Sequence, residues 1–185
     1  MVPLASLWLP ILLSAVLVFI ASSVLHMVLK YHRSDWAKLP NEDAAMDALR
    51  PVPLGDYMMP HSTGPEGMKD PAFLEKMKRG PIAVVTIMGG DMMTSFRKAL
   101  IGWFVYSLVL NIFVAYVAGR TLPRGTEYIA VFRIVATVAF LAYGFALAQM
   151  SIWYGRRWAT TLKSLVDSLI YGLLTAGIFG WLWPK

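Results

Sequence analysis

The 185-residue chain contains no cysteine, which excludes disulfide bonds, thiolate-bound iron–sulfur clusters and thiol catalysis. It also lacks the short GxSxG, HExxH and P-loop motifs that mark common catalytic and nucleotide-binding sites. Charged residues are scarce, at 15%, whereas hydrophobic residues make up 57% of the chain. Water-soluble domains seldom have this balance, so the composition points to an integral membrane protein without a recognisable catalytic apparatus.

Four apolar segments are long enough to cross a bilayer, whose hydrocarbon core of ~30 Å needs about 20 helical residues. They lie at residues 1–29, 99–119, 128–154 and 161–183. The first is longer than the apolar part of a signal peptide, and its basic flank, Lys30 and Arg33, follows it rather than precedes it. We therefore expect a retained first span and an all-α integral membrane protein with four transmembrane helices.

Basic residues flank these spans unevenly. The opposite side of the predicted membrane receives only Arg120, Arg124 and Lys185. The other basic flanking residues fall on one side: Lys30, Arg33, Lys38, Arg97, Lys98, Arg156, Arg157 and Lys163. Because cytoplasmic flanks are rich in Lys and Arg, we predict a multi-pass protein of the bacterial inner membrane with both termini periplasmic. The same rule accounts for the net charge of +6 without a nucleic-acid partner.

The segment between the first two spans, residues 30–98, differs from the rest because it holds nine of the eleven acidic residues. Capping signals predict two short helices, one over 42–49 that Asn41 caps, and one that Asp70-Pro71 opens and Arg79-Gly80 closes. A glycine-bounded run of β-branched residues predicts a strand at 82–88, and 54–59 has strand length too. We expect a cytoplasmic insertion of short helices, in which these two runs could pair as a two-stranded ribbon.

The stretch GDYMMPH within this insertion groups several side chains that can bind a metal. Thioether sulfur suits monovalent copper, so Met58, Met59 and His61 form a candidate copper site. The competing interpretation, packing methionines beside an exposed turn, is favoured because the spacing matches no recognised metal pattern. We expect no cofactor, regard copper as disfavoured, and consider a bound lipid compatible with the sequence. His26 and His32, at the end of the first span, are interpreted as interfacial residues rather than ligands.

Polar side chains within the spans are candidate functional sites, because ionisable groups are costly in a bilayer. They are Asn111, Arg133, Gln149 and Asp167. In a transport interpretation, Asp167 binds protons and Arg133 binds anions or gates charge. In a structural interpretation, Asp167 bonds to Lys163 and Gln149. Arg133 then reaches the interface or pairs with Asn111 or Glu127. The structural interpretation is favoured because few charges lie deep and no proline interrupts the last three spans.

Small residues recur at four-residue spacing in the last two spans, a pattern that lets helix backbones approach closely. They are Gly144, Ala148, Gly172, Ala176 and Gly180. Since only a short loop joins these two spans, internal packing of a hairpin is the first use we expect for this face. The remaining apolar faces suit lipid or another subunit equally well.

Several segments resemble a family of small bacterial inner-membrane proteins that have no assigned activity. They are YHRSDWAKLPNEDA, GDYMMPH, MKDP, GPIAVVT and SIWYGRRWATTLKSLVDSLIYGLLTAGIFGWLWP. The resemblance implies a four-span bacterial protein and supplies no catalytic residue.

The function expected from the sequence is non-catalytic: an accessory, scaffolding or assembly subunit of a larger membrane complex, or a self-associating bundle. Its partners would be the lipid bilayer and other membrane-protein subunits or further copies of the chain. One alternative is a small ion or proton transporter or channel that uses Asp167 and Arg133. A second is a copper-handling membrane protein that uses the methionines and histidine of GDYMMPH.

Overall fold

The computed structural model describes residues 1–185, and it is mostly helical, at 71%, as predicted. Four helical segments are long and apolar enough to cross a membrane: Leu4–Val28, Met92–Thr121, Tyr128–Tyr154 and Trp158–Trp181. The chain divides into two compact units. We call Met1–Ala37 together with Ser95–Lys185 the helical unit, and Lys38–Thr94 the small unit.

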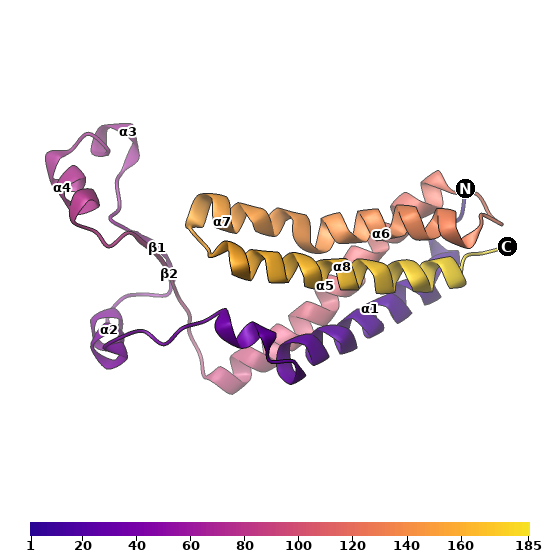
Figure 1. Cartoon of the computed structure of the whole chain (residues 1–185), viewed down its shortest axis with the longest axis horizontal. Helices are drawn as coiled ribbons and strands as arrows, with labels where there is room; N and C mark the ends of the chain where they lie inside the picture. The colour runs from indigo at the N-terminus through magenta and orange to yellow at the C-terminus, as the bar shows by residue number, and fades with distance from the viewer. The chain divides into compact units, whose positions relative to one another are not determined.

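The helical unit is built around the long helices, with α6 and α8 running side by side (Figure 1). Its elements are η1 (Leu4–Leu7), α1 (Trp8–Ser23), the π-helical turn η2 (Val24–Val28), η3 (Tyr31–Ser34), α5 (Met92–Thr121), α6 (Tyr128–Gly144), η4 (Phe145–Leu147), α7 (Ala148–Tyr154) and α8 (Trp158–Trp181). One chain end bonds to the last turn of α5, and the other bonds to the loop that joins α5 to α6. The Val2 amide donates to Gly119 O, and the Gly125 amide donates to Pro184 O, each at 2.9 Å.

Glycines set the contact between α6 and α8. A Cβ at Gly144 would lie 2.3 Å from the Ser168 hydroxyl oxygen, and one at Gly180 would lie 2.7 Å from the Tyr128 ring. A Cβ at Gly172 would approach the α6 backbone to 3.1 Å. Real Cβ atoms essentially never come as close as 2.7 Å, and 3.1 Å is tighter than most Cβ contacts, so all three positions favour glycine. These three contacts, spaced along the two helices, therefore hold α8 in a single register against α6.

The third long segment is not one continuous α-helix, although no proline interrupts it. The α-helix α6 ends at Gly144, a 3₁₀ turn follows over Phe145–Leu147, and α7 then continues to Tyr154. The Tyr106 hydroxyl of α5 donates to the Ala142 carbonyl at 3.1 Å, which satisfies a backbone acceptor near this break. The segment is still long and apolar enough to cross a membrane, as predicted, although close packing at a glycine can interrupt a helix as proline does.

The small unit contains three short helices and a two-stranded antiparallel sheet: α2 (Glu42–Leu49), β1 (Gly55–Met59), α3 (Gly64–Gly67), α4 (Pro71–Arg79) and β2 (Ala83–Ile87). The α4 helix has the predicted bounds, with Asp70 accepting from the Ala72 amide at 3.0 Å and Gly80 ending the helix at φ 61°. The predicted ribbon is present, with Gly55 opposite Ile87.

Asn41 differs from its expected role. The α2 helix begins at Glu42 as predicted, but the Asn41 side chain makes no capping hydrogen bond. Its backbone instead lies in the left-handed region at φ 56°, which asparagine tolerates better than most residues. Asn41 therefore supplies the turn before the helix, while Glu42 and Asp43 place negative charge at the positive helix end.

We predict that Gly144→Ala lowers the free energy of unfolding by about 1–3 kcal/mol, because the added methyl overlaps Ser168 and forces α6 away from α8. Detergent-based chemical unfolding measures the change. Ser168→Gly should restore part of the loss in the double variant. Gly102→Ala is the matched control, since a Cβ there meets nothing within 4 Å. Equal stability of the two single alanine variants would contradict this account of the contact.

Candidate functional site: a buried carboxylate beside two histidines

A buried aspartate on α8 meets two histidines from the end of the first apolar segment. The Asp167 side chain is only 4% exposed, and its Oδ2 lies 2.9 Å from His32 Nε2 and 3.8 Å from His26 Nε2. His26 belongs to the π-helical turn η2, and His32 belongs to η3. The two imidazole rings stack at 4.2 Å between centroids and are nearly parallel. One ligand atom from each residue lies within 4.8 Å of the other two.

Hydrogen bonds at Nδ1 fix the tautomer of each neutral imidazole. His32 Nδ1 lies 2.7 Å from Asp35 Oδ2, and His26 Nδ1 lies 3.0 Å from the Ser22 carbonyl oxygen. A carboxylate and a carbonyl only accept hydrogen bonds, so the proton of each ring is on Nδ1. Nε2 of each neutral ring therefore carries a lone pair. Both lone-pair nitrogens lie on the Asp167 side of the cluster.

Two buried atoms of the cluster have no hydrogen-bond partner. They are Asp167 Oδ1 and His32 Nε2. The 2.9 Å contact between His32 Nε2 and Asp167 Oδ2 is close enough for an ion pair but lacks hydrogen-bond geometry. Buried polar groups without partners are rare in folded proteins, because each forfeits its hydration. The cluster thus gathers hydrogen-bond acceptors, and no donor reaches Asp167 Oδ1 or His32 Nε2.

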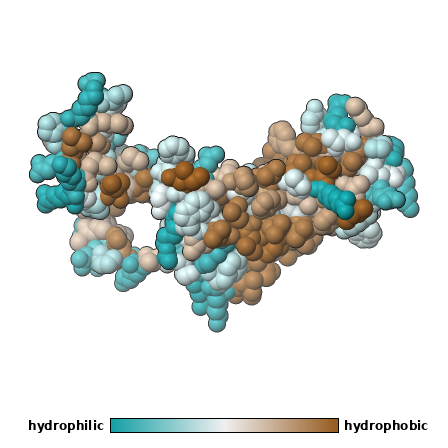
Figure 2. Space-filling model, turned by 45° about the horizontal axis from the view of Figure 1, so that its top comes forward, coloured by the Kyte–Doolittle hydropathy of each residue, from teal (hydrophilic) through white to brown (hydrophobic).

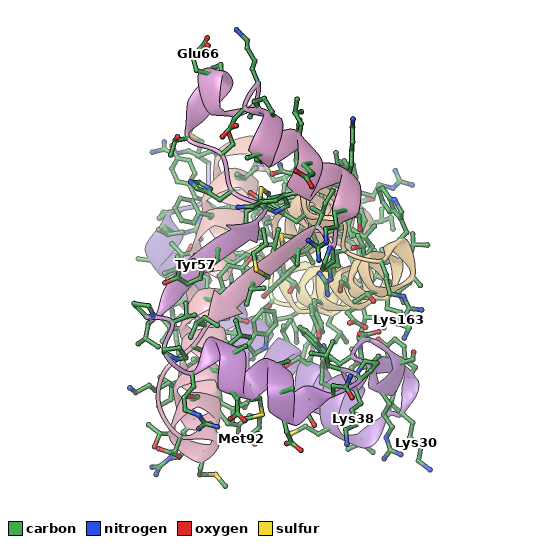
Figure 3. The ribbon with its side chains drawn as sticks, turned by 90° about the vertical axis from the view of Figure 1, so that its left-hand side faces the viewer. Lys30, Lys38, Tyr57, Glu66, Met92 and Lys163 are labelled. Carbon is green, nitrogen blue, oxygen red and sulfur yellow. The ribbon has the colours of Figure 1, made fainter.

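Lys163 holds the histidine segment against α8. Its ammonium donates to the Tyr31 carbonyl, the Ser34 hydroxyl and Asp35 Oδ1, the last two at 2.8 Å. Lys163 lies in the N-terminal part of α8, and Figure 3 labels it beside that helix. Burial alone would raise the pKa of Asp35. Hydrogen bonds from His32 and Lys163, with the Lys163 charge, outweigh it and hold that pKa below its usual range. Asp35 is therefore a carboxylate that orients His32.

A groove of about 640 Å³ opens beside the cluster and is largely apolar. Its lining includes Ser22, His26, Asp167 and an aromatic group made of Trp103, Tyr106, Tyr143 and Tyr171. The Trp103 indole donates to the Ser22 hydroxyl at 2.8 Å, which ties α5 to α1 at the groove wall. His26 and Asp167 thus border a space large enough for a small ligand.

The other polar residues predicted within the spans do not join this cluster. Arg133 is exposed on α6 and makes no side-chain hydrogen bond or ion pair, and Gln149 is exposed on α7. Asn111 is buried and donates to the Ser107 carbonyl at 2.8 Å and to the Tyr143 hydroxyl at 3.2 Å. The expected bonds from Asp167 to Lys163 and Gln149, and between Arg133 and Asn111, are not formed.

The remaining predicted site residues occupy two places. Gly144, Gly172 and Gly180 lie at the contact of α6 with α8, where Ala176 is fully buried and Ala148 is half-buried. In the small unit, Met58 and Met59 are consecutive in β1, so their side chains point to opposite faces of the sheet. His61 is exposed beyond the strand. The strand therefore does not direct both sulfur atoms towards one point.

The sequence-based interpretation of His26 and His32 as interfacial residues missed their convergence on Asp167. More than 130 residues separate them from Asp167, and no local spacing joins positions so far apart. One signal was available: Asp167 is the single acidic residue within the four predicted spans, and two of the three histidines lie at the end of another span.

Comparisons with known proteins assign the chain to no group. No family model matches it, and neither does any curated protein or solved structure.

We predict that Lys163→Met releases η3 from α8 and lowers the free energy of unfolding by about 2 kcal/mol. The variant leaves the Asp35 carboxylate, 9% exposed, without its cation. Hydrogen exchange should quicken at the amides of Tyr31–Ser34 while the amides in the middle of α8 stay protected. Lys38→Met is the control, because Lys38 is 82% exposed and pairs with Glu42 only at 3.9 Å. Unchanged exchange in η3 would refute the anchoring role.

Proposed function

We propose that the chain is a multi-pass protein of the bacterial inner membrane, related to the small four-span proteins that its sequence resembles. In this proposal it acts without catalysis, as an accessory or assembly subunit of a larger membrane complex. Both termini are periplasmic and the small unit is cytoplasmic. The small unit docks on a protein subunit of the same complex, and that contact covers the apolar side chains that the small unit leaves exposed.

The apolar outer faces of the long helices support membrane insertion. Figure 2 shows brown, hydrophobic side chains spread over the surface of these helices. No more than 39% of the most apolar window of any long helix is buried within the chain, so most of this apolar surface has no protein cover. Water would make such exposure costly, at about 25 cal/mol per Å², whereas lipid removes that cost.

The observation that carries the docking proposal is the absence of a core in the small unit. No residue of Lys38–Thr94 is buried, although the segment forms three helices and a paired sheet. Large apolar side chains stand exposed instead, among them Leu54 at 68%, Ile82 at 61% and Met88 at 84%. An isolated two-stranded sheet is at best marginally stable in water, so a folded unit of this kind needs a covering surface.

One face of the two-stranded sheet offers the contact. Met58 and Val84 are register partners and are 48% and 46% exposed, whereas Tyr57, labelled in Figure 3, lies on the opposite, half-buried face. Beside them the Thr86 hydroxyl donates to Asp56 at 2.7 Å, which gives the apolar pair a polar margin. Both outer strand edges are unpaired, and such edges accept a further strand from a partner.

The transporter alternative has less support, because its two proposed ionisable groups do not share a path. Arg133 is exposed on α6, where its long side chain can reach the membrane interface. Asp167 is buried among histidines on α8. The copper alternative through Met58, Met59 and His61 also has less support, because consecutive methionines in a strand point to opposite faces of the sheet.

Gentle extraction from native membranes, followed by native mass measurement, tests the proposed role. We expect the chain to migrate with at least one other membrane protein. The double variant Met58→Gln/Val84→Thr should lose that partner at least tenfold while remaining monodisperse, because it removes the apolar pair and keeps strand-forming residues. Lys78→Gln on the exposed side of α4 is the matched control. A chain that purifies alone, or only with copies of itself, would contradict an accessory role.

The proposed orientation is tested separately, and the absence of native cysteine makes labelling straightforward. We expect Lys69→Cys, in the small unit, to react with a membrane-impermeant maleimide only after the inner membrane is opened. Glu127→Cys, in the exposed connection before α6, should react in intact spheroplasts. The reverse pattern would place the small unit in the periplasm and overturn the topology.

A further inference from the structure

We propose that His26, His32 and Asp167 form a binding site for a divalent transition-metal ion of the Zn²⁺ type. The donor atoms are the two Nε2 nitrogens and the carboxylate of Asp167. They come from three separate elements, η2, η3 and α8, and they converge within 4.8 Å of one another. Bond lengths of about 2.0–2.2 Å place the ligands of a tetrahedral zinc ion roughly 3.3–3.6 Å apart. The two imidazole nitrogens lie 2.9 Å and 3.8 Å from Asp167 Oδ2, which is close to that spacing.

The hydrogen bonds behind the ligands fit a metal site. A metal-binding imidazole almost always donates its other N–H to a carboxylate or a backbone carbonyl, which fixes the tautomer and aims the free nitrogen at the ion. Both forms occur here: His32 donates to Asp35, and His26 donates to the Ser22 carbonyl. Asp35 is held in turn by Lys163, so His32 has a supported outer shell.

The unpartnered atoms point to a missing cation. Asp167 Oδ1 and His32 Nε2 are buried acceptors without a hydrogen-bond donor. Lys163 does not supply the charge, because an ammonium has three N–H groups and all three are engaged with Tyr31, Ser34 and Asp35. A divalent ion at the cluster gives the unpartnered His32 Nε2 a partner and neutralises the buried Asp167 carboxylate.

The donor set also selects the kind of ion. Two imidazole nitrogens suit zinc, iron, cobalt, nickel or copper, whereas magnesium and calcium prefer oxygen ligands alone. Three protein ligands leave a coordination position open for water or a small anionic group. Since His26 and Asp167 line the 640 Å³ groove, that open position is reachable from it.

Cobalt and zinc titration of the full-length protein tests the site. The protein is purified with a chelator, exchanged into chelator-free detergent and titrated with Co²⁺, whose visible ligand-field bands report bound nitrogen ligands. Zn²⁺ is then added as a competitor, and bound metal is counted by mass spectrometry. We expect one ion per chain, and loss of the Co²⁺ bands as Zn²⁺ takes the same site.

Single variants separate this site from incidental binding. His26→Gln and Asp167→Asn should abolish stoichiometric binding, and Asp35→Asn should weaken it about 10–100-fold by disturbing the orientation of His32. His61→Gln is the matched control, because it removes the exposed histidine of the small unit and should leave binding unchanged. His26 is half exposed, so its variant remains informative if Asp167→Asn does not fold. No bound ion, or binding that persists in His26→Gln, overturns the proposal.

Discussion

The close contact of α6 with α8 governs the rest of the helical unit. It depends on glycines that let two backbones meet, and Ser168 occupies the space that a side chain at position 144 would need. Asp167 directly precedes Ser168 on α8, so the contact that sets the helix register also sets the height of the buried carboxylate. The 3₁₀ turn begins directly after Gly144, the residue that packs against Ser168. Packing between apolar helices thus positions the most polar feature of the unit.

The site itself joins this hairpin to the first apolar segment. A carboxylate that is 4% exposed needs compensation for lost hydration, and the protein places imidazoles rather than an arginine or lysine beside it. Imidazole can be neutral at physiological pH, and its second nitrogen can be engaged elsewhere, as Asp35 and the Ser22 carbonyl do here. The lysine that would be an obvious counter-ion bonds to the η3 segment instead. Each part of this polar junction has its own role. Lys163 anchors the η3 segment, Asp35 orients His32, and His32 faces the Asp167 carboxylate.

Much of the architecture could be predicted from the sequence because its signals are local. Hydropathy and length gave the four long helices, and Asp70-Pro71 with Arg79-Gly80 gave the bounds of α4. The ribbon followed from a β-branched run between glycines. The site could not be predicted in this way, because its geometry depends on how α1 ends and on which residues of α8 face it. Lys163 lies one helical turn before Asp167, which suggested a local bond, whereas the fold directs Lys163 to η3. The prediction for Arg133 was limited in the same way. Hydropathy placed Arg133 within a span but did not show which direction its side chain faces.

The π-helical turn at Val24–Val28 gives this architecture an unusual sensitivity to chain length. Such a turn is equivalent to one extra residue accommodated in a helix, and each residue rotates a helical side chain by about 100°. A homologous chain one residue shorter at this point would continue as a regular α-helix and carry its imidazole to a different side, while keeping nearly the same hydropathy profile. The position of His26 beside Asp167 therefore depends on one additional residue, which the hydropathy profile does not reveal.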